Sequence, residues 1–408
     1  MKLFLSLALI VFASYSFVCN EPQGVYQVII KNQTNISVED AYVEFNLENL
    51  KGNLSINDGS YWIPYQIERN ESGGNKVCVI LGLKPHEEKV LSIIYGDSVI
   101  NNQFKARTYA ELAMKPGDVY YDGKFRGNSF VKVTKLKVPL IHTDHDALFK
   151  YEGPGWESEK VGYRIYLDWR NAIDIFGKKK DQLVLVNVGV HDTVAKDDSY
   201  HNMQEWGMDI FKVGNSLGIG SFGMWHNGKV NMVSKTDSIF YEIDENGPLK
   251  SRVKLNYYGW KVGDKKYDLQ SKLSITSGSR LTKNELSVSD ENVTLVTGLA
   301  KYPGTQFFKS EMGGEWSYIA LFGNQTLVSD NDKLGIALFY RTENYDQLTE
   351  DDLSYIIKFK TVNRKVEYYF CAAWEQEQYA IKNISEFTTY LNETQMLLNN
   401  PPTLNVKK

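Results

Sequence analysis

The side chains best suited to chemistry gather in one segment of this chain, between residues 142 and 226. Five of the six histidines and four of the eight tryptophans fall there. They are His142, His145, His191, His201 and His226, with Trp156, Trp169, Trp206 and Trp225. Histidine can exchange a proton near neutral pH, and indole rings offer flat faces to sugar rings and similar ligands. The segment is therefore predicted to carry the functional surface.

The run from Tyr163 to Arg170 is the most informative stretch inside this segment. If it forms one strand, alternate side chains point to opposite faces of a sheet. One face would carry Tyr163, Ile165, Leu167 and Trp169 into a core, and the other would carry Arg164, Tyr166, Asp168 and Arg170. Guanidinium groups bind a carboxylate or a sulfate through paired hydrogen bonds. A ligand site is one interpretation of this face, and a solvated face with cross-strand ion pairs is the other.

The loop His142-Thr143-Asp144-His145-Asp146 offers four side chains that could bind a metal ion. If the loop is extended, His142, Asp144 and Asp146 share a face. No separated partner motif, such as His-Glu-x-x-His, completes a metal signature. We therefore predict no functional metal site and no cofactor, and we expect polar-loop or proton-transfer roles for these residues.

Nucleotides and nucleic acids are disfavoured as partners. The segment from Gly218 to Gly223 fits the spacing G-x-G-x-x-G, but no strand–helix–strand unit surrounds it, so these glycines are expected to serve turns or close strand packing. The formal net charge is −4, whereas a nucleic-acid partner requires a basic surface. A local group of Arg and Lys side chains can still bind an acidic substrate, because it acts within about 8–10 Å.

The N-terminus has the layout of a secretory signal peptide. Apolar residues run from Leu3 to Phe12 and are followed by small and polar ones, so residues 1–18 are expected to be removed on export. No later segment reaches the roughly 18 apolar residues that a membrane-spanning helix needs. We expect a secreted or periplasmic protein. Cys19 lies where a bacterial lipoprotein carries its lipid, so anchoring through Cys19 is an alternative.

Short alternating runs of β-branched and aromatic residues, separated by turn clusters, predict an all-β protein. The runs between Val25 and Tyr95 indicate a small antiparallel β-sandwich over residues 23–98. Strand-like runs then recur to the C-terminus, which favours a larger β-sandwich or super-sandwich over residues 105–400.

Three further features of the sequence bear on the fold and on the class of enzyme. Only the segment from Asn383 to Leu398 shows helical spacing of its apolar residues. Cys78 and Cys371 could form one disulfide in an oxidising compartment. A Gly-x-Ser-x-Gly match occurs at Gly214–Gly218, but no helical pattern follows it as a nucleophile elbow requires, which weakens the case for a hydrolase of that kind.

Three long stretches carry a family resemblance. They are Tyr151–Ser158 (YEGPGWES), Gly162–Lys178 (GYRIYLDWRNAIDIFGK) and Tyr200–Asp209 (YHNMQEWGMD), the last followed by Lys212-Val213-Gly214. These stretches closely resemble the DUF4861 family, and Ile63–Gln66 with Leu83–Pro85 are similar to the N-terminal sandwich of that family. The resemblance covers most of the chain beyond the expected signal peptide.

The resemblance implies an exported protein that acts on carbohydrate. The family is common in polysaccharide-using Bacteroidetes, and the activity it implies is uronate dehydration by β-elimination. The implied partner is thus an oligosaccharide that contains uronate. Trp169 departs from the pattern, since a polar or basic residue is expected there in relatives.

The roles of individual residues follow from the chemistry of elimination, which removes the C5 proton of a uronate and expels the C4 substituent. A cation must neutralise the carboxylate, and Arg164 or Arg170 is predicted to do so. His201 is the predicted base and Tyr166 the predicted acid, with His145 in reserve for either role. Substrate contacts are predicted for Arg170, Trp156, Trp206 and Asp168.

Two other functions remain open from the sequence. In a glycan-binding protein, Trp156, Trp169 and Trp206 would only stack on sugar, and no titrating group would be needed. A glycoside hydrolase would need two opposed carboxylates. The candidates for that pair are Glu152, Glu157, Glu159, Asp168 and Asp209.

Overall fold

The computed structural model describes residues 24–48, 50, 52–69, 74–97, 99, 103–116, 119–127, 129–190 and 200–408. The expected signal peptide, Cys19 and His191 lie outside these residues. Within them, no helix is long and apolar enough to cross a bilayer. Strands make up most of the regular structure, which confirms the all-β prediction.

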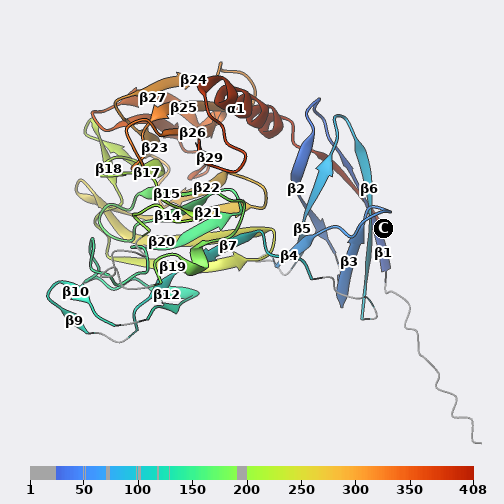
Figure 1. Cartoon of the computed structure of the whole chain (residues 1–408), viewed down its shortest axis with the longest axis horizontal. Coiled ribbons are helices and arrows are strands. Elements are labelled where there is room, and N and C mark those ends of the chain that lie inside the picture. Colours follow the sequence, from blue (N-terminus) through green and yellow to red (C-terminus); the bar gives the residue numbers. More distant parts are fainter. Residues whose placement is uncertain are drawn as a thin grey trace, which may run out of the picture.

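Two antiparallel sheets near the N-terminus enclose one hydrophobic core (Figure 1). The first sheet contains, in order, β3 (Asn53–Asn57), β6 (Glu88–Gly96), β1 (Gly24–Lys31) and β30 (Thr403–Lys407). The second contains β2 (Val38–Leu47), β5 (Asn75–Leu83) and β4 (Tyr65–Arg69). Strand β30 comes from the far end of the chain, beyond residue 400, and pairs with β1, so the C-terminus returns to the N-terminal sheets.

A nine-stranded sheet organises the larger body of the molecule. Its order is β12 (Lys135–Lys137), β19 (Ser238–Asn246), β20 (Lys250–Val262), β21 (Lys265–Thr276), β22 (Thr282–Val288), β29 (Lys365–Trp374), β26 (Lys333–Arg341), β25 (Trp316–Asn324) and β24 (Thr305–Lys309). In β20, Val253, Leu255 and Tyr257 point into the core while the residues between them are more exposed. This alternation is the period-2 pattern expected of a sheet with one buried face.

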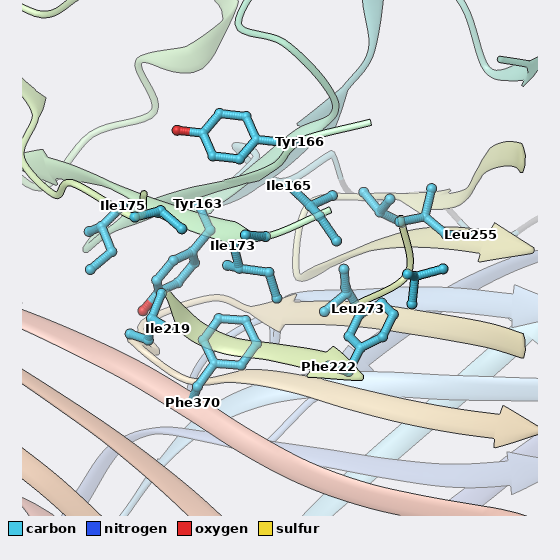
Figure 2. Close-up of a cluster of buried hydrophobic side chains, with 14 of the residues drawn as sticks. Tyr163, Ile165, Tyr166, Ile173, Ile175, Ile219, Phe222, Leu255, Leu273 and Phe370 are labelled. Atoms are coloured by element: carbon cyan, nitrogen blue, oxygen red, sulfur yellow. The ribbon is translucent and has the colours of Figure 1, made fainter. Parts of the chain in front are cut away.

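Two five-stranded sheets contribute to the same core as the nine-stranded sheet. One contains β16 (Gly207–Asp209), β15 (Ile173–Lys178), β14 (Gly162–Ile165), β13 (Gly155–Ser158) and β7 (Thr108–Glu111). The other contains β18 (Lys229–Met232), β17 (Ile219–His226), β23 (Thr294–Ala300), β28 (Ser354–Lys360) and β27 (Tyr345–Glu350). Ile165 of β14 belongs to the same core cluster as Leu273 and Phe222, and Figure 2 labels it in that cluster together with Tyr163 of the same strand.

Short elements complete the described structure. Two-stranded pairs are formed by β9 (Tyr120–Tyr121) with β10 (Lys124–Phe125) and by β8 (Ala113–Met114) with β11 (Val131–Lys132). Single 3₁₀ turns span Leu185–Asn187 and Thr342–Asn344.

The predicted helix is present as α1 (Ile384–Asn399). The side chain of Asn383 accepts a hydrogen bond from the Glu386 amide (3.0 Å), and the Glu386 carboxylate accepts one from the Asn383 side chain (2.6 Å), which caps the first turn. Phe387 and Leu391 then pack on the face of β25 and β26 that points away from the main core.

Close strand packing explains one glycine of the segment Gly218 to Gly223, as its sequence predicted. Gly220 has a φ of +70°, and a Cβ there would lie 2.6 Å from Cδ1 of Phe370. Cys78 and Cys371 are both free thiols in separate buried regions, so the disulfide considered from the sequence is wrong.

The N-terminal sheets contact the larger body through charged side chains. Lys250 lies 2.8 Å from Glu44 and 3.0 Å from Glu68. The Gln66 side chain donates to Glu245 across the same boundary (3.1 Å). Burial, and then the negative charge of Glu68, raise the pKa of Glu245 to about 7, although Arg252 opposes the shift.

Candidate functional site

The run from Tyr163 to Arg170 is not one strand. Strand β14 ends at Ile165, and residues 167–170 form a bend and a turn. Tyr163 and Ile165 face the core and Arg164 faces away from it, as alternation predicted. Beyond Tyr166 the alternation fails, because Asp168 accepts a hydrogen bond from the Arg170 amide (2.8 Å) and closes the turn. As a result Asp168 is buried and Trp169 is exposed, the reverse of the prediction.

Arg164 is the centre of a buried polar network. Its guanidinium donates to Asp174 (2.8 Å), Asp209 (2.6 Å) and the hydroxyl of Tyr166 (2.9 Å), and a weaker contact reaches the hydroxyl of Tyr200 (3.3 Å). Only 2% of the Arg164 surface is exposed. Because all three guanidinium nitrogens already donate to protein oxygens, Arg164 cannot act as the predicted clamp for a substrate carboxylate.

Strand pairing explains how this network forms. Arg164 in β14 lies directly opposite Asp174 in β15, and β15 pairs in turn with β16, which carries Asp209. Burial, and then the neighbouring charge of Asp209, raise the pKa of Asp174 to about 6, with Arg164 opposing the shift. Two carboxylates therefore share one guanidinium in a site closed to water.

Tyr166 has a different environment from the one its predicted role needs. Its hydroxyl donates to Asp174 and accepts from Arg164, and the side chain is buried. Burial raises the pKa of Tyr166 well above its usual value, although the positive charge of Arg164 opposes this. The hydroxyl thus holds its proton inside the network, which argues against Tyr166 as the acid and assigns it a positioning role.

His201 lies where the network reaches the surface. Its Nδ1 is 3.3 Å from Oδ2 of Asp209, and 49% of its side chain is exposed. The imidazole also packs against the Tyr200 ring, with centroids 4.2 Å apart. A histidine whose Nδ1 faces a buried carboxylate is held in one orientation.

A second charged group surrounds Arg170. Its guanidinium lies 2.7 Å from Asp144 and 3.2 Å from Glu152, donates to both oxygens of Asp168, and stacks on the Tyr166 ring with its carbon 3.8 Å from the centroid. Asp168 is thus the buried partner of Arg170, so its predicted substrate contact is wrong. Arg170 itself stays at the edge of the surface and is connected to the Arg164 network through Tyr166.

The loop from His142 to Asp146, for which polar or proton-transfer roles were predicted, places its two histidines in separate ion pairs. His142 bonds Asp146 in a buried position (2.8 Å). His145 is 73% exposed and contacts Asp144, with Glu152 3.6 Å away. The ligand atoms of Asp144, His145 and Glu152 lie within 4.8 Å of one another, an arrangement that could hold a metal ion.

The guanidinium of Arg170 already supplies positive charge to two members of this trio, Asp144 and Glu152. The chemistry of the donor set therefore does not demand a cation.

The tryptophans differ in exposure. Trp156 is 0% exposed and its indole donates to Thr282 (2.9 Å), so the prediction that it contacts substrate is wrong. Trp206 is half-buried with its ring edge-on to Phe176. Trp169 is 47% exposed at the turn after β14.

A cleft of about 440 Å³ opens beside this turn. Trp169 and Arg170 line one part of it, and Lys229, Lys235 and Lys261 line another. Each of the charged residues that line the described part of the cleft is basic. Sequence reasoning missed these lysines because they come from β18, the loop that follows it and the end of β20.

The structure also resembles solved proteins at a low level. One is a protein in the glycosyl hydrolase family 38 from Enterococcus faecalis, with a TM-score of 0.46 and 10% identity over 95% of this chain and 48% of that one. Another is an α-mannosidase from Enterococcus faecalis V583, also with a TM-score of 0.46 and 10% identity, covering 95% of this chain and 46% of that one. This chain thus spans about half the length of each.

Sequence comparison identifies the family. No curated protein sequence matches the chain. A family model does match it, over residues 30–404, and its description is "Domain of unknown function (DUF4861)". The match takes in the N-terminal sheets, the Arg164 network and α1, and it agrees with the resemblance of the three sequence motifs. The chain therefore belongs to the DUF4861 family.

Proposed function

We propose that this protein is a carbohydrate-active lyase that removes the C5 proton of a uronate and expels the C4 substituent by β-elimination. The observation that carries the proposal is the half-exposed His201, whose Nδ1 faces the buried Asp209 while Arg164 binds the same carboxylate oxygen. A binding module needs no oriented titrating group, whereas proton abstraction does.

His201 is the base in this scheme. When Nδ1 donates to Asp209, the basic lone pair of the imidazole is on Nε2, and the carboxylate stabilises the imidazolium that forms on proton abstraction. Arg164 fixes the position of Asp209, with 2.6 Å between Nη2 and Oδ2. Arg164 is therefore a positioning residue that acts through Asp209.

In this scheme Arg170, and not Arg164, neutralises the substrate carboxylate. Arg170 lines the cleft with its side chain 11% exposed, and its Nη1 makes no hydrogen bond or ion pair with the described residues, whereas all three guanidinium nitrogens of Arg164 donate to protein oxygens. A cation at this position lowers the cost of the enolate that develops as the C5 proton leaves. Stacking on the Tyr166 ring fixes the plane of the guanidinium.

The acid that protonates the leaving oxygen is assigned to His145. It is exposed, and its ring lies 3.6 Å from Glu152, whose other oxygen is 3.7 Å from Arg164. The two histidines are thus connected through Glu152, Arg164 and Asp209. This connection supports His145 over Tyr166, whose hydroxyl is turned into the buried network.

A glycoside hydrolase is less well supported, because each carboxylate that was a candidate for the hydrolytic pair has a basic partner. Glu157 is buried against Lys178 (2.6 Å), Glu159 contacts Arg107, and the remaining three contact Arg164 or Arg170. Such pairing suits structural support and orientation better than attack on, or protonation of, a glycosidic bond.

The test is an absorbance assay with oligosaccharides that end in glucuronate, iduronate or galacturonate, and with neutral oligosaccharides of equal length. Elimination creates a C4–C5 double bond conjugated to the carboxylate, which absorbs in the ultraviolet. We expect this signal only from the acidic substrates. New reducing ends without the signal would indicate a hydrolase, and binding without any product would indicate a glycan-binding protein.

A further inference from the structure

The cleft beside Trp169 has features that the proposed reaction does not use. We propose that it is a subsite for a second anionic sugar, which carries a carboxylate or a sulfate ester and lies along the chain from the reacting uronate. The inference rests on the proposed function, and it narrows the substrate class to oligosaccharides with negative charge on more than one ring.

The exposed indole of Trp169 is held by a tightly anchored turn. Two residues after Trp169, Asn171 adopts a φ of +43°. The Asn171 side chain donates to the backbone oxygen of Val233 (3.1 Å) and accepts from the Tyr257 hydroxyl (2.8 Å). A turn whose backbone is anchored in this way loses little conformational freedom when a ring stacks on the indole that it carries. Its exposure therefore suits ligand binding better than it suits folding.

The positive charge of the cleft is available to a ligand. Lys229, Lys235 and Lys261 are exposed, and no ion pair joins any of them to an acidic residue in the part of the chain that the structure describes. The Lys261 amide donates to the backbone oxygen of Lys235 (2.8 Å), which keeps these two residues adjacent. In a chain with a net charge of −4, three unpaired lysines in one cleft favour an anionic ligand.

Arg170 connects this cleft to the proposed reaction centre. Arg170 lines the cleft, and its guanidinium stacks on Tyr166, whose hydroxyl belongs to the Arg164 network. A glycan held at Arg170 by its reacting carboxylate can therefore extend toward Trp169. There, one ring would stack on the indole while its acidic group meets the lysines.

The combination of one indole with a compact group of cations favours an acidic glycan over nucleic acid. Single-stranded nucleic acid is normally bound along an extended basic groove with several stacking aromatics. A neutral glycan would use the indole and leave the lysines without a role. The shared chemistry of the expected ligands is a sugar ring with a carboxylate or a sulfate.

Calorimetric titration of the His201→Ala protein, which does not consume substrate under the proposal, tests this inference. The probes are tetragalacturonate for carboxylates, a sulfated galactan tetrasaccharide for sulfate esters, cellotetraose as the neutral glycan, and a DNA oligonucleotide. We expect binding of at least one acidic tetrasaccharide, weakened by added salt. Trp169→Ala should weaken it about tenfold and Lys261→Glu at least severalfold.

Matched control substitutions are Trp62→Ala and Lys84→Glu, which alter exposed residues in the connections between strands of the N-terminal sheets and should leave affinity unchanged. Equal affinity for cellotetraose, tighter binding of the oligonucleotide, or full affinity in both Trp169→Ala and Lys261→Glu would overturn the inference. These titrations need no turnover, so acidic glycan binding can be found even if elimination is not. Conversely, elimination with an unchanged KM in Trp169→Ala would overturn the subsite and leave the proposed function standing.

Discussion

Replacing Arg164 with methionine tests the buried network at its centre. The change removes the guanidinium from Asp174 and Asp209, both of which are almost fully buried. Removing one partner of a buried ion pair leaves an uncompensated charge and typically costs about 3–5 kcal/mol. Since two carboxylates are affected, we expect a loss in the upper half of that range at neutral pH.

Urea unfolding followed by tryptophan fluorescence measures this loss, at pH about 7.5 and about 5. Without Arg164, protonation is the remaining way to neutralise the carboxylates, so the loss should be smaller at the lower pH. The control is Arg341→Met, because Arg341 pairs with Glu315 and Glu367 in a more exposed position and should cost less than about 1 kcal/mol. A loss for Arg164→Met no larger than the control, or one that grows at low pH, would refute this account of the network.

Three further substitutions give independent checks. The folded-state pKa of Glu245 is about 7 and its usual value is 4.5, so the contribution of Glu245 to stability falls as pH rises between these values. The Glu245→Gln protein should therefore be more stable than the wild type by about 1 kcal/mol above pH 7 and equal to it below pH 4.5. Thermal unfolding measures this difference, and the control is Glu88→Gln, an exposed substitution that should show no such trend. Trp156→Phe should lower the unfolding free energy by about 2–3 kcal/mol without changing glycan affinity, which titration on the same preparation would check. Gly220→Ala should cost about 1–3 kcal/mol in urea unfolding, because the added Cβ meets Phe370, and a neutral result would remove the packing argument for this glycine.

Much of the fold follows from local patterns in the sequence. Period-2 alternation identified the all-β class, and the spacing of apolar residues located α1. The return of β30 to the N-terminal sheets was not predictable, because pairing between Thr403–Lys407 and β1 depends on contacts across almost the whole chain.

The candidate site was located in part, and its errors have physical causes. Arg164 faces away from the core as predicted, but its partner Asp174 is identified only by the register of β14 with β15. The turn that exposes Trp169 follows from hydrogen bonds of Asp168, which alternation alone does not anticipate. Trp156 lies in a strand that is buried on both faces, where an aromatic residue carries no signal that separates core from ligand site.

The central claim is that His201 is the base of an elimination reaction, and its direct test is the initial rate of ultraviolet absorbance increase for His201→Gln. The substrate is the acidic oligosaccharide most active with the wild type, and the matched control is His86→Gln, which changes the histidine of the N-terminal sheets. Because positioned acid–base groups contribute roughly 10²–10⁴-fold to rate, we expect at least a 100-fold loss in His201→Gln, with its unfolding transition unchanged. The His86→Gln protein should keep the wild-type rate. A wild-type rate in a correctly folded His201→Gln protein would contradict the account.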